Sequence, residues 1–109
     1  MREIKFRAWS KTGKRMIGWE EMTANHAKVY TYFLWTDMYK LMQYTGLKDK
    51  NGAEIYERDV LRWAGVNCLI SWNKHGHFDC GLDSLNMAIA YHSEIIGNVH
   101  EHPELLVVE

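Results

Sequence analysis

LMQYTGLKDKNGAEIYERDV, residues 41–60, contains the strongest turn signal in the chain. Asn51-Gly52 stands between two apolar segments, and Asn and Gly best tolerate the positive φ angles of a type I′ hairpin turn. The pair therefore predicts a hairpin in which Ile55-Tyr56 resumes the strand. The turn explains the glycine without a ligand, because Gly46 and Gly52 are too few and wrongly spaced for a phosphate-binding loop.

Short strands are expected on both sides of this hairpin. Alternation of apolar and polar residues over 4–9, with a return strand over 16–19, predicts an N-terminal hairpin. Residues 60–63, 68–72 and 78–82 follow with tight turns, which is typical of the meander in small SH3-like barrels. A last strand over 94–99 ends before Pro103, the single proline.

Two segments are harder to assign. Residues 28–35 are apolar on both faces of an extended chain, which predicts either a strand covered on both sides or an edge in an oligomer contact. Residues 36–43 fit a helix, with Asp37 as its cap, and fit a strand equally well. A short helix over Leu85, Ala88 and Ile89, capped by Asp83 or Ser84, is also expected.

Length and pattern together predict one mainly β domain over residues 1–109. It is a small barrel-like meander with an N-terminal hairpin and one or two short helices. Apolar residues make up 47% of the chain, including five Trp, six Tyr and three Phe. So many rings in so short a chain leave aromatic surface outside the core, and such surface is typical of a partner contact.

Charge and cysteine content argue against a strongly basic nucleic-acid-binding protein and against a disulfide-rich one. The net charge of −1 gives no global attraction to nucleic acid, although basic residues gather near the start and acidic residues near the end. Cys68 and Cys80 are too few for a disulfide framework, and both alternate with apolar positions as small core residues do. With no signal-peptide pattern and no long apolar run, we expect a cytoplasmic protein.

Three stretches carry a family resemblance: REIKFRAWS with KRM at 2–10 and 14–16, LMQYTGLKDKNGAEIYERDVLRW at 41–63, and EIIGNVHEHPELL at 94–106. In this order and spacing the chain resembles the YopX family, small proteins of bacteriophages and prophages. The resemblance implies a mostly β fold with a barrel-like part, a phage or prophage origin and an intracellular life in a bacterial host. It implies no activity.

The sequence departs from the family pattern at two positions. Arg58 stands where the family's run before the acid usually has Gly, so we expect a backbone there that does not need a positive φ angle. Ser10 stands where an Asp is common. Residues 67–93 match no firm pattern and are where members of the family are expected to differ.

The residues that could carry chemistry favour ordinary structural roles. On one strand His75 and Asp79 would lie about 13 Å apart, too far for one ion, and Cys80 would face the other way. Glu54, Glu57 and Asp59 cluster beside Arg58, which favours ion pairing or strand-start capping over paired-carboxylate catalysis. No catalytic motif is present, so we expect no catalytic residues, no metal, no cofactor and a non-enzymatic protein.

The first functional hypothesis is a phage-encoded binding module that associates with itself and docks on a host or phage protein. The aromatic residues expected to carry the contact are Tyr30, Tyr32, Trp35 and Tyr39. Inhibition of a host defence system is one form of this function that the phage origin and small size suggest.

The alternative hypothesis is an SH3-like module that binds nucleic acid. Basic and aromatic residues interleave as they do in grooves that bind single strands. The residues expected to take part are Lys5, Arg7, Trp9, Arg62 and Trp63.

Overall fold

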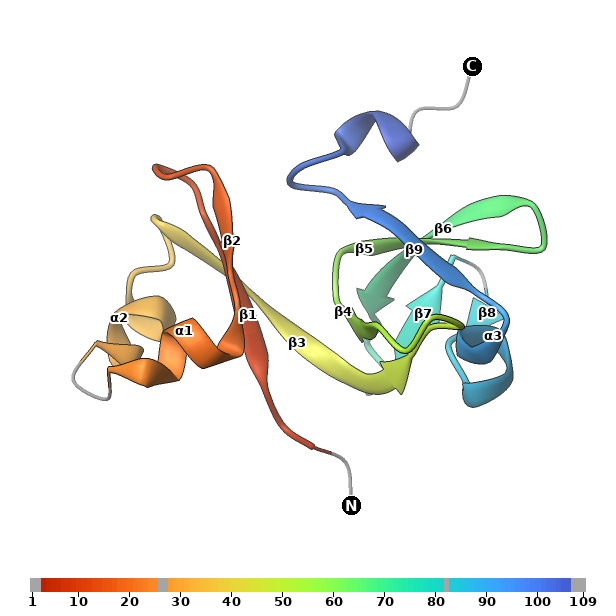
Figure 1. The fold of residues 1–109 in the computed structure, drawn as a ribbon, viewed down its shortest axis with the longest axis horizontal. Helices are drawn as coiled ribbons and strands as arrows, with labels where there is room; N and C mark the ends of the chain where they lie inside the picture. Colours follow the sequence, from red (N-terminus) through yellow and green to blue (C-terminus); the bar gives the residue numbers. More distant parts are fainter. Residues whose placement is uncertain (1–2, 26–27, 82, 107–109) are drawn as a thin grey trace. The chain divides into compact units, whose positions relative to one another are not determined.

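The structure, a computed structural model, describes residues 3–25, 28–81 and 83–106. The chain divides into two compact units, Met1–Tyr44 (unit 1) and Thr45–Glu109 (unit 2), which are described one at a time. The mainly β fold is confirmed, with nine strands and three short α-helices among the described residues (Figure 1). The single domain over residues 1–109 stays a prediction.

Unit 1 is built on the central strand β1. Its elements are β1 (Phe6–Ser10), β2 (Arg15–Ile17), α1 (Trp19–Ala24), α2 (Val29–Leu34) and the first part of β3 (Tyr39–Lys48). β1 pairs antiparallel with both β2 and β3, with Ala8 opposite Ile17 on one side and Leu41 on the other. Apolar residues of both helices pack against the side of the sheet that carries Ala8, Ile17 and Leu41. The resulting core comprises Ala8, Ile17 and Met22 with the partly buried Phe6, Trp19, Tyr32, Tyr39 and Leu41.

The N-terminal hairpin is confirmed, but its return strand is shorter than expected. β2 ends at Ile17, and Trp19 begins α1 because its side chain packs against the core that Met22 fills from the next turn. Ser10, where the family has Asp, is buried, and its hydroxyl accepts a hydrogen bond from the Gly13 N–H at 3.0 Å. The short side chain of Ser10 thus stabilises the turn as an Asp would.

The strand predicted over residues 28–35 is wrong, because residues 29–34 form α2. Apolar residues on both faces fit period 2 and period 3.6 equally well, so packing decides. In α2, Val29 and Tyr32 are partly buried while Tyr30 and Leu34 point outward, which is a helical pattern. Residues 39–48 form a strand and no helix, and residues 39–43 of this strand pair with β1.

The turn at Asn51-Gly52 joins β3 to β4 (Glu54–Tyr56) as expected, but it is not type I′. Gly52 has φ +81°, whereas Asn51 is not among the described residues with positive φ. The carboxylate of Asp49 organises the turn instead. Its Oδ1 accepts the N–H groups of Asn51 and Ala53 at 2.9 Å each, and its Oδ2 accepts the N–H of Ile95 at 3.0 Å.

Unit 2 contains the barrel-like part. Its five-stranded sheet has the order β8-β7-β6-β5-β9, in which β5 to β8 follow one another as the predicted meander. The elements are β5 (Asp59–Trp63), β6 (Val66–Trp72), β7 (Phe78–Cys80), β8 (Asp83–Ser84), α3 (Met87–Tyr91), β9 (Glu94–Asn98) and a 3-10 helix, η1 (Pro103–Leu106).

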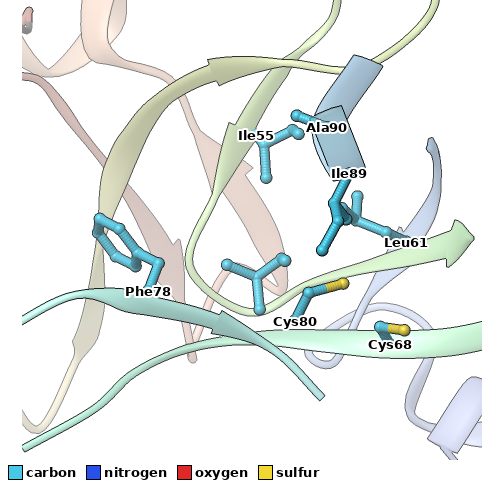
Figure 2. Close-up of a cluster of buried hydrophobic side chains, with 8 residues drawn as sticks. Ile55, Leu61, Cys68, Phe78, Cys80, Ile89 and Ala90 are labelled. Carbon is cyan, nitrogen blue, oxygen red and sulfur yellow. The ribbon is translucent and has the colours of Figure 1, made fainter. Parts of the chain in front are cut away.

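The core of unit 2 gathers buried side chains from these strands and from α3, as Figure 2 shows. It comprises Ile55, Leu61, Cys68, Ile70, Phe78, Cys80, Ile89 and Ala90. The predicted helix exists, but its cap is wrong. The Asn86 side chain accepts the Ile89 N–H at 2.9 Å, while Asp83 and Ser84 pair with β7.

The expectation that Arg58 needs no positive φ angle is also wrong, since its φ is 71°. The turn between β4 and β5 brings two backbone groups of Arg58 to β6 and to the residue after β9: its N–H donates to Ile70 O, and its carbonyl accepts from Val99 N–H. Asp59 closes the same turn, because its Oδ2 accepts the Tyr56 N–H at 2.8 Å. The turn therefore requires a left-handed backbone at position 58, both for Arg58 and for a glycine in its place.

Replacing Asp49 with Asn should lower the free energy of unfolding by about 2–4 kcal/mol. The amide is neutral and offers one acceptor oxygen in place of two, so at least one of three backbone N–H groups loses its acceptor and the others lose a charged one. Urea denaturation followed by circular dichroism measures the change. The same substitution at exposed Asp37 should change stability by less than about 0.5 kcal/mol. Equal effects at the two positions would contradict the role given to Asp49.

Replacing Arg58 with Gly should raise the free energy of unfolding by about 0.5–1 kcal/mol. A side chain in the left-handed region costs about 1–2 kcal/mol, which exceeds the greater freedom of Gly in the unfolded chain. The matched control is Arg62→Gly, at an exposed position in β5, which should lower stability by about 0.5–1 kcal/mol. If both variants lose stability alike in urea, backbone strain at Arg58 is not the constraint.

Candidate protein-binding surface

The outer side of α2 presents large apolar side chains to solvent. Tyr30 and Leu34, one helical turn apart, are 68% and 72% exposed, and Trp35 at the end of the helix is 54% exposed. We call these three residues the α2 apolar face. Phe33 lies at its edge and packs edge-on against Phe6 with ring centroids 5.4 Å apart. Exposed Tyr, Trp and Leu side chains this close together are typical of a binding surface.

The structure separates the four aromatic residues predicted for protein binding. Tyr30 and Trp35 are on the α2 apolar face. Tyr32 and Tyr39 instead pack against each other at a centroid distance of 4.9 Å and against the core of unit 1. Their contact anchors α2, which is six residues long and has no side-chain cap at Lys28. Short helices depend on such packing.

A shallow pocket adjoins the α2 apolar face. It has a volume of about 410 Å³ and is lined by Leu34, Trp35, Thr36, Asp37 and Met38. Its lining combines apolar side chains with one carboxylate. Such a hollow beside exposed rings offers a place for an anchoring side chain of a partner.

Arg15 and Glu21 form an ion pair in unit 1. The Arg15 guanidinium donates to both carboxylate oxygens of Glu21, to Oε1 at 3.0 Å. This hydrogen bond lowers the pKa of Glu21 and raises the pKa of Arg15. Both groups are exposed, so the pair contributes little to stability.

The residues predicted for nucleic-acid binding are divided between the two units. In unit 1, Lys5, Arg7 and Trp9 are all partly buried. The Lys5 ammonium lies 3.4 Å from a carboxylate oxygen of Glu3 and 5.0 Å from the centre of the Tyr44 ring. Lys5 therefore already has an anionic and an aromatic partner within the chain.

In unit 2, Arg62 and Trp63 lie on opposite faces of β5, because neighbouring strand residues alternate. Arg62 is exposed, whereas Trp63 packs against the core of unit 2. Their adjacency in the sequence therefore does not produce a paired cation and stacking ring.

Among the acidic and histidine residues considered for chemistry, Asp59, His75 and His77 lie in or next to turns of unit 2. Asp59 is buried and closes its turn, which confirms the strand-start capping considered for it. The His77 ring lies 3.6 Å from Asp79 and 3.2 Å from the Ser84 hydroxyl, while His75 stays exposed in the β6–β7 turn. Within residues 3–25, 28–81 and 83–106, no three His, Cys, Asp or Glu side chains are grouped to hold a metal ion.

Cys68 and Cys80 are free, buried core residues, as predicted. They lie on neighbouring strands, and Figure 2 shows both sulfur atoms within the core of unit 2. Burial, together with the nearby Cys68 thiol, raises the pKa of Cys80 to about 12. A thiol that stays neutral behaves as a small apolar side chain and not as a nucleophile.

Sequence reasoning missed several exposed apolar residues. Leu34 lies in a segment expected to be a strand, and the helix expected over Leu85, Ala88 and Ile89 carried no expectation for Met87 or Tyr91. The available signal was spacing: Tyr30 with Leu34, and Met87 with Tyr91, are each four residues apart. That spacing places each pair on one side of a helix once the helix is known.

Among the described residues, no helix is both long and apolar enough to span a bilayer. A family model described as YopX protein matches residues 5–107, nearly the whole chain. The chain belongs to the YopX family. The resemblance read from the three sequence stretches is therefore confirmed.

The fold of this YopX-family chain is shared with a solved structure. The crystal structure of protein EF1440 from Enterococcus faecalis superposes with a TM-score of 0.71 at 25% sequence identity, covering 98% of this chain and 100% of that one. No curated protein matches the sequence. The likeness supports the mainly β, barrel-like architecture.

The raised pKa of Cys80 predicts a stability change at high pH. A thiol pKa of about 12 in the folded chain exceeds the ordinary value of 9.0, so folding favours the protonated form. The contribution of this thiol to the free energy of unfolding should be fully present below about pH 9. It should be lost as the pH rises toward 12. The Cys80→Ala variant should lose less stability between pH 9 and pH 10.5 in urea denaturation. Parallel pH profiles for the two proteins would contradict the raised pKa.

Proposed function

We propose that this chain is a non-enzymatic binding module that docks on another protein through the α2 apolar face. The observation that carries the proposal is the exposure of Tyr30 and Leu34 on one side of a helix whose other side is fixed in the core. The partner offers an apolar groove that accepts this side of the helix, in the manner of helix-in-groove recognition.

The energetic argument rests on pre-organisation. Tyr32 and Tyr39 hold α2 in place, so binding does not have to order the helix. Tyr and Trp are common among the residues that dominate interface energies, and both are present on the α2 apolar face. The pocket beside Trp35 can accept one side chain from the partner.

The family resemblance supports the biological setting of the proposal. The module is encoded by a phage or prophage and acts in the cytoplasm of the bacterial host, where its partner is a host or phage protein. Inhibition of a host defence system is one form that this docking takes. We propose that copies of the chain also associate with each other through exposed residues of unit 2, such as Met87 and Tyr91.

Binding of nucleic acid by Lys5, Arg7, Trp9, Arg62 and Trp63 is the alternative function. Lys5 lies beside Glu3, and Trp63 packs against the core of unit 2. Both side chains are therefore engaged within the chain, which favours protein docking over nucleic-acid binding. Binding to a labelled single strand that weakens steeply with salt, and is lost in the Lys5→Glu, Arg7→Glu double variant, would support it over the first proposal.

The test is capture from host lysate with the Tyr30→Ala, Leu34→Ala double variant. Removing two exposed anchors should weaken binding of the captured protein about 100-fold, while stability changes by less than about 1 kcal/mol. A photo-crosslinking amino acid at position 30 should form its covalent adduct with the same protein, identified by mass spectrometry. Biolayer interferometry with that purified protein gives the affinity.

The matched control is Met87→Ala, Tyr91→Ala, which removes two exposed residues of α3 at the same spacing. It should leave partner binding unchanged and reduce self-association in sedimentation velocity. If the α2 variant binds as tightly as the unaltered chain, the α2 apolar face is not the docking surface.

A further inference from the structure

The turn between β3 and β4 contains a chemically reactive pair, Asn51-Gly52. A backbone nitrogen can attack the side-chain amide of the asparagine that precedes it, and glycine hinders this attack least because it has no side chain. Asn51 is the only asparagine in the sequence that is followed by glycine. The sequence therefore singles out this asparagine as the most reactive one.

Both residues of the pair are open to solvent. Asn51 and Gly52 are exposed, and a Cβ placed on Gly52 would have no atom beyond its chain neighbours within 4 Å. Asn51 is held by its backbone N–H, which donates to Asp49 Oδ1 at 2.9 Å, whereas no partner within the described ranges holds its side-chain amide. The side chain is therefore free to rotate toward the Gly52 nitrogen, and water and hydroxide can reach the reacting atoms.

Other asparagine side chains of unit 2 are engaged in hydrogen bonds. Asn73 accepts the His75 N–H at 2.8 Å and donates to Asp79 at 3.0 Å. Asn86 caps α3, and Asn98 Oδ1 accepts two backbone N–H groups. Each of these three asparagines is followed by a residue with a large side chain. A reacting amide would have to break these bonds first, so structure and sequence select the same position.

The turn organised by Asp49 opposes the reaction. The Gly52 N–H donates to the Asp49 carbonyl at 3.0 Å, and Asp49 Oδ1 holds the N–H groups of Asn51 and Ala53. The Gly52 nitrogen must leave its hydrogen bond before it can reach the Asn51 side chain. Reaction therefore requires local opening of the turn, and its rate follows the population of the open form.

We propose that Asn51 is a site of spontaneous deamidation and that opening of the Asp49 turn sets the rate. In the open turn the Gly52 nitrogen gives its proton to solvent base and bonds to Asn51 Cγ. The bond between Cγ and the amide nitrogen breaks, and the amide takes a proton from water and leaves as ammonia. Water then opens the succinimide ring at either carbonyl, which gives aspartate or isoaspartate at position 51.

The modification weakens the turn in which it occurs. In isoaspartate the main chain runs through Cγ and is one atom longer, so Asp49 Oδ1 can no longer accept both N–H groups of the original turn. The new carboxylate also repels that of Asp49. Loss of an acceptor for one backbone N–H should lower the ratio of folded to unfolded chain at least about tenfold. This change is independent of docking through the α2 apolar face, because it uses no residue of unit 1.

Incubation of the whole chain in mildly alkaline buffer, followed by peptide mapping with mass spectrometry, tests the proposal. Conversion should be concentrated at Asn51, and an isoaspartate methyltransferase with S-adenosylmethionine should methylate the product. Conversion should be about 5–30-fold slower than in a synthetic peptide of residues 46–56, as expected for opening of a surface turn. Asn73, in another turn, is the internal control and should stay unconverted.

Variants separate the role of Asp49 from the effect of the product. In a folded Asp49→Asn variant, conversion of Asn51 should be at least about fivefold faster, because the turn opens more often. Hydrogen exchange of the Gly52 N–H in the unaltered chain measures the same opening without a variant, and its protection should match the slowing relative to the peptide. Asn51→Asp has the new charge on a main chain of normal length. It should lose less stability in urea than the isoaspartate form, which ion exchange isolates.

Several results would overturn the proposal. These are an intact Asn51 in the whole chain while the peptide converts, equal conversion at Asn73, and conversion as fast as in the peptide. A folded Asp49→Asn variant that converts no faster, or a Gly52 N–H without protection, would overturn the role of the turn. An isoaspartate form as stable as the unaltered chain would overturn the predicted loss of stability.

Discussion

The carboxylate of Asp49 makes the interaction on which unit 2 depends. It accepts three backbone N–H groups, two from its own turn and one from Ile95, 46 residues further along the chain. The Lys50 N–H adds a bond to the Ser93 carbonyl at the same place. The turn after β3 is thereby joined to the start of β9, and β9 in turn pairs with β5. A buried carboxylate with three donors is strongly stabilised, and removal of one oxygen leaves buried donors unpaired.

The second buried acid, Asp59, works in the same way over a shorter distance. It closes the turn at Arg58, whose backbone bonds to residues of β6 and of the segment after β9. Two acids of the central stretch, Asp49 and Asp59, thus hold turns. This use of the carboxylates supports a proposal in which exposed surfaces, and not the acids of the central stretch, carry the function.

The exposed apolar surfaces of α2 and α3 exist because core contacts stabilise these short helices, which would be unfolded in isolation. α2 and α3 have six and five residues, far below the length at which an isolated helix is stable. Tyr32 fixes one of them, and Ile89 with Ala90 fixes the other. Each helix can then present large apolar residues to solvent, and the loss of water around them on binding is favourable.

Local chemistry in the sequence was enough to predict the mainly β class, the meander after residue 59 and the two buried cysteines, whereas the family was predicted from the resemblance of three stretches. Period-2 alternation and turn residues act over a few positions, so they can be read without a structure. Ser10 and Gly52 illustrate this, since each position serves a turn within a few residues of itself.

Only the tertiary structure decided which face of residues 28–35 is buried, and therefore that Tyr30 and Leu34 are exposed while Tyr32 is not. It also decided the φ angle of Arg58 and the third bond of Asp49. Each depends on residues distant in the sequence, and a run that is apolar on both faces fits helix and strand alike until a partner surface selects one of them.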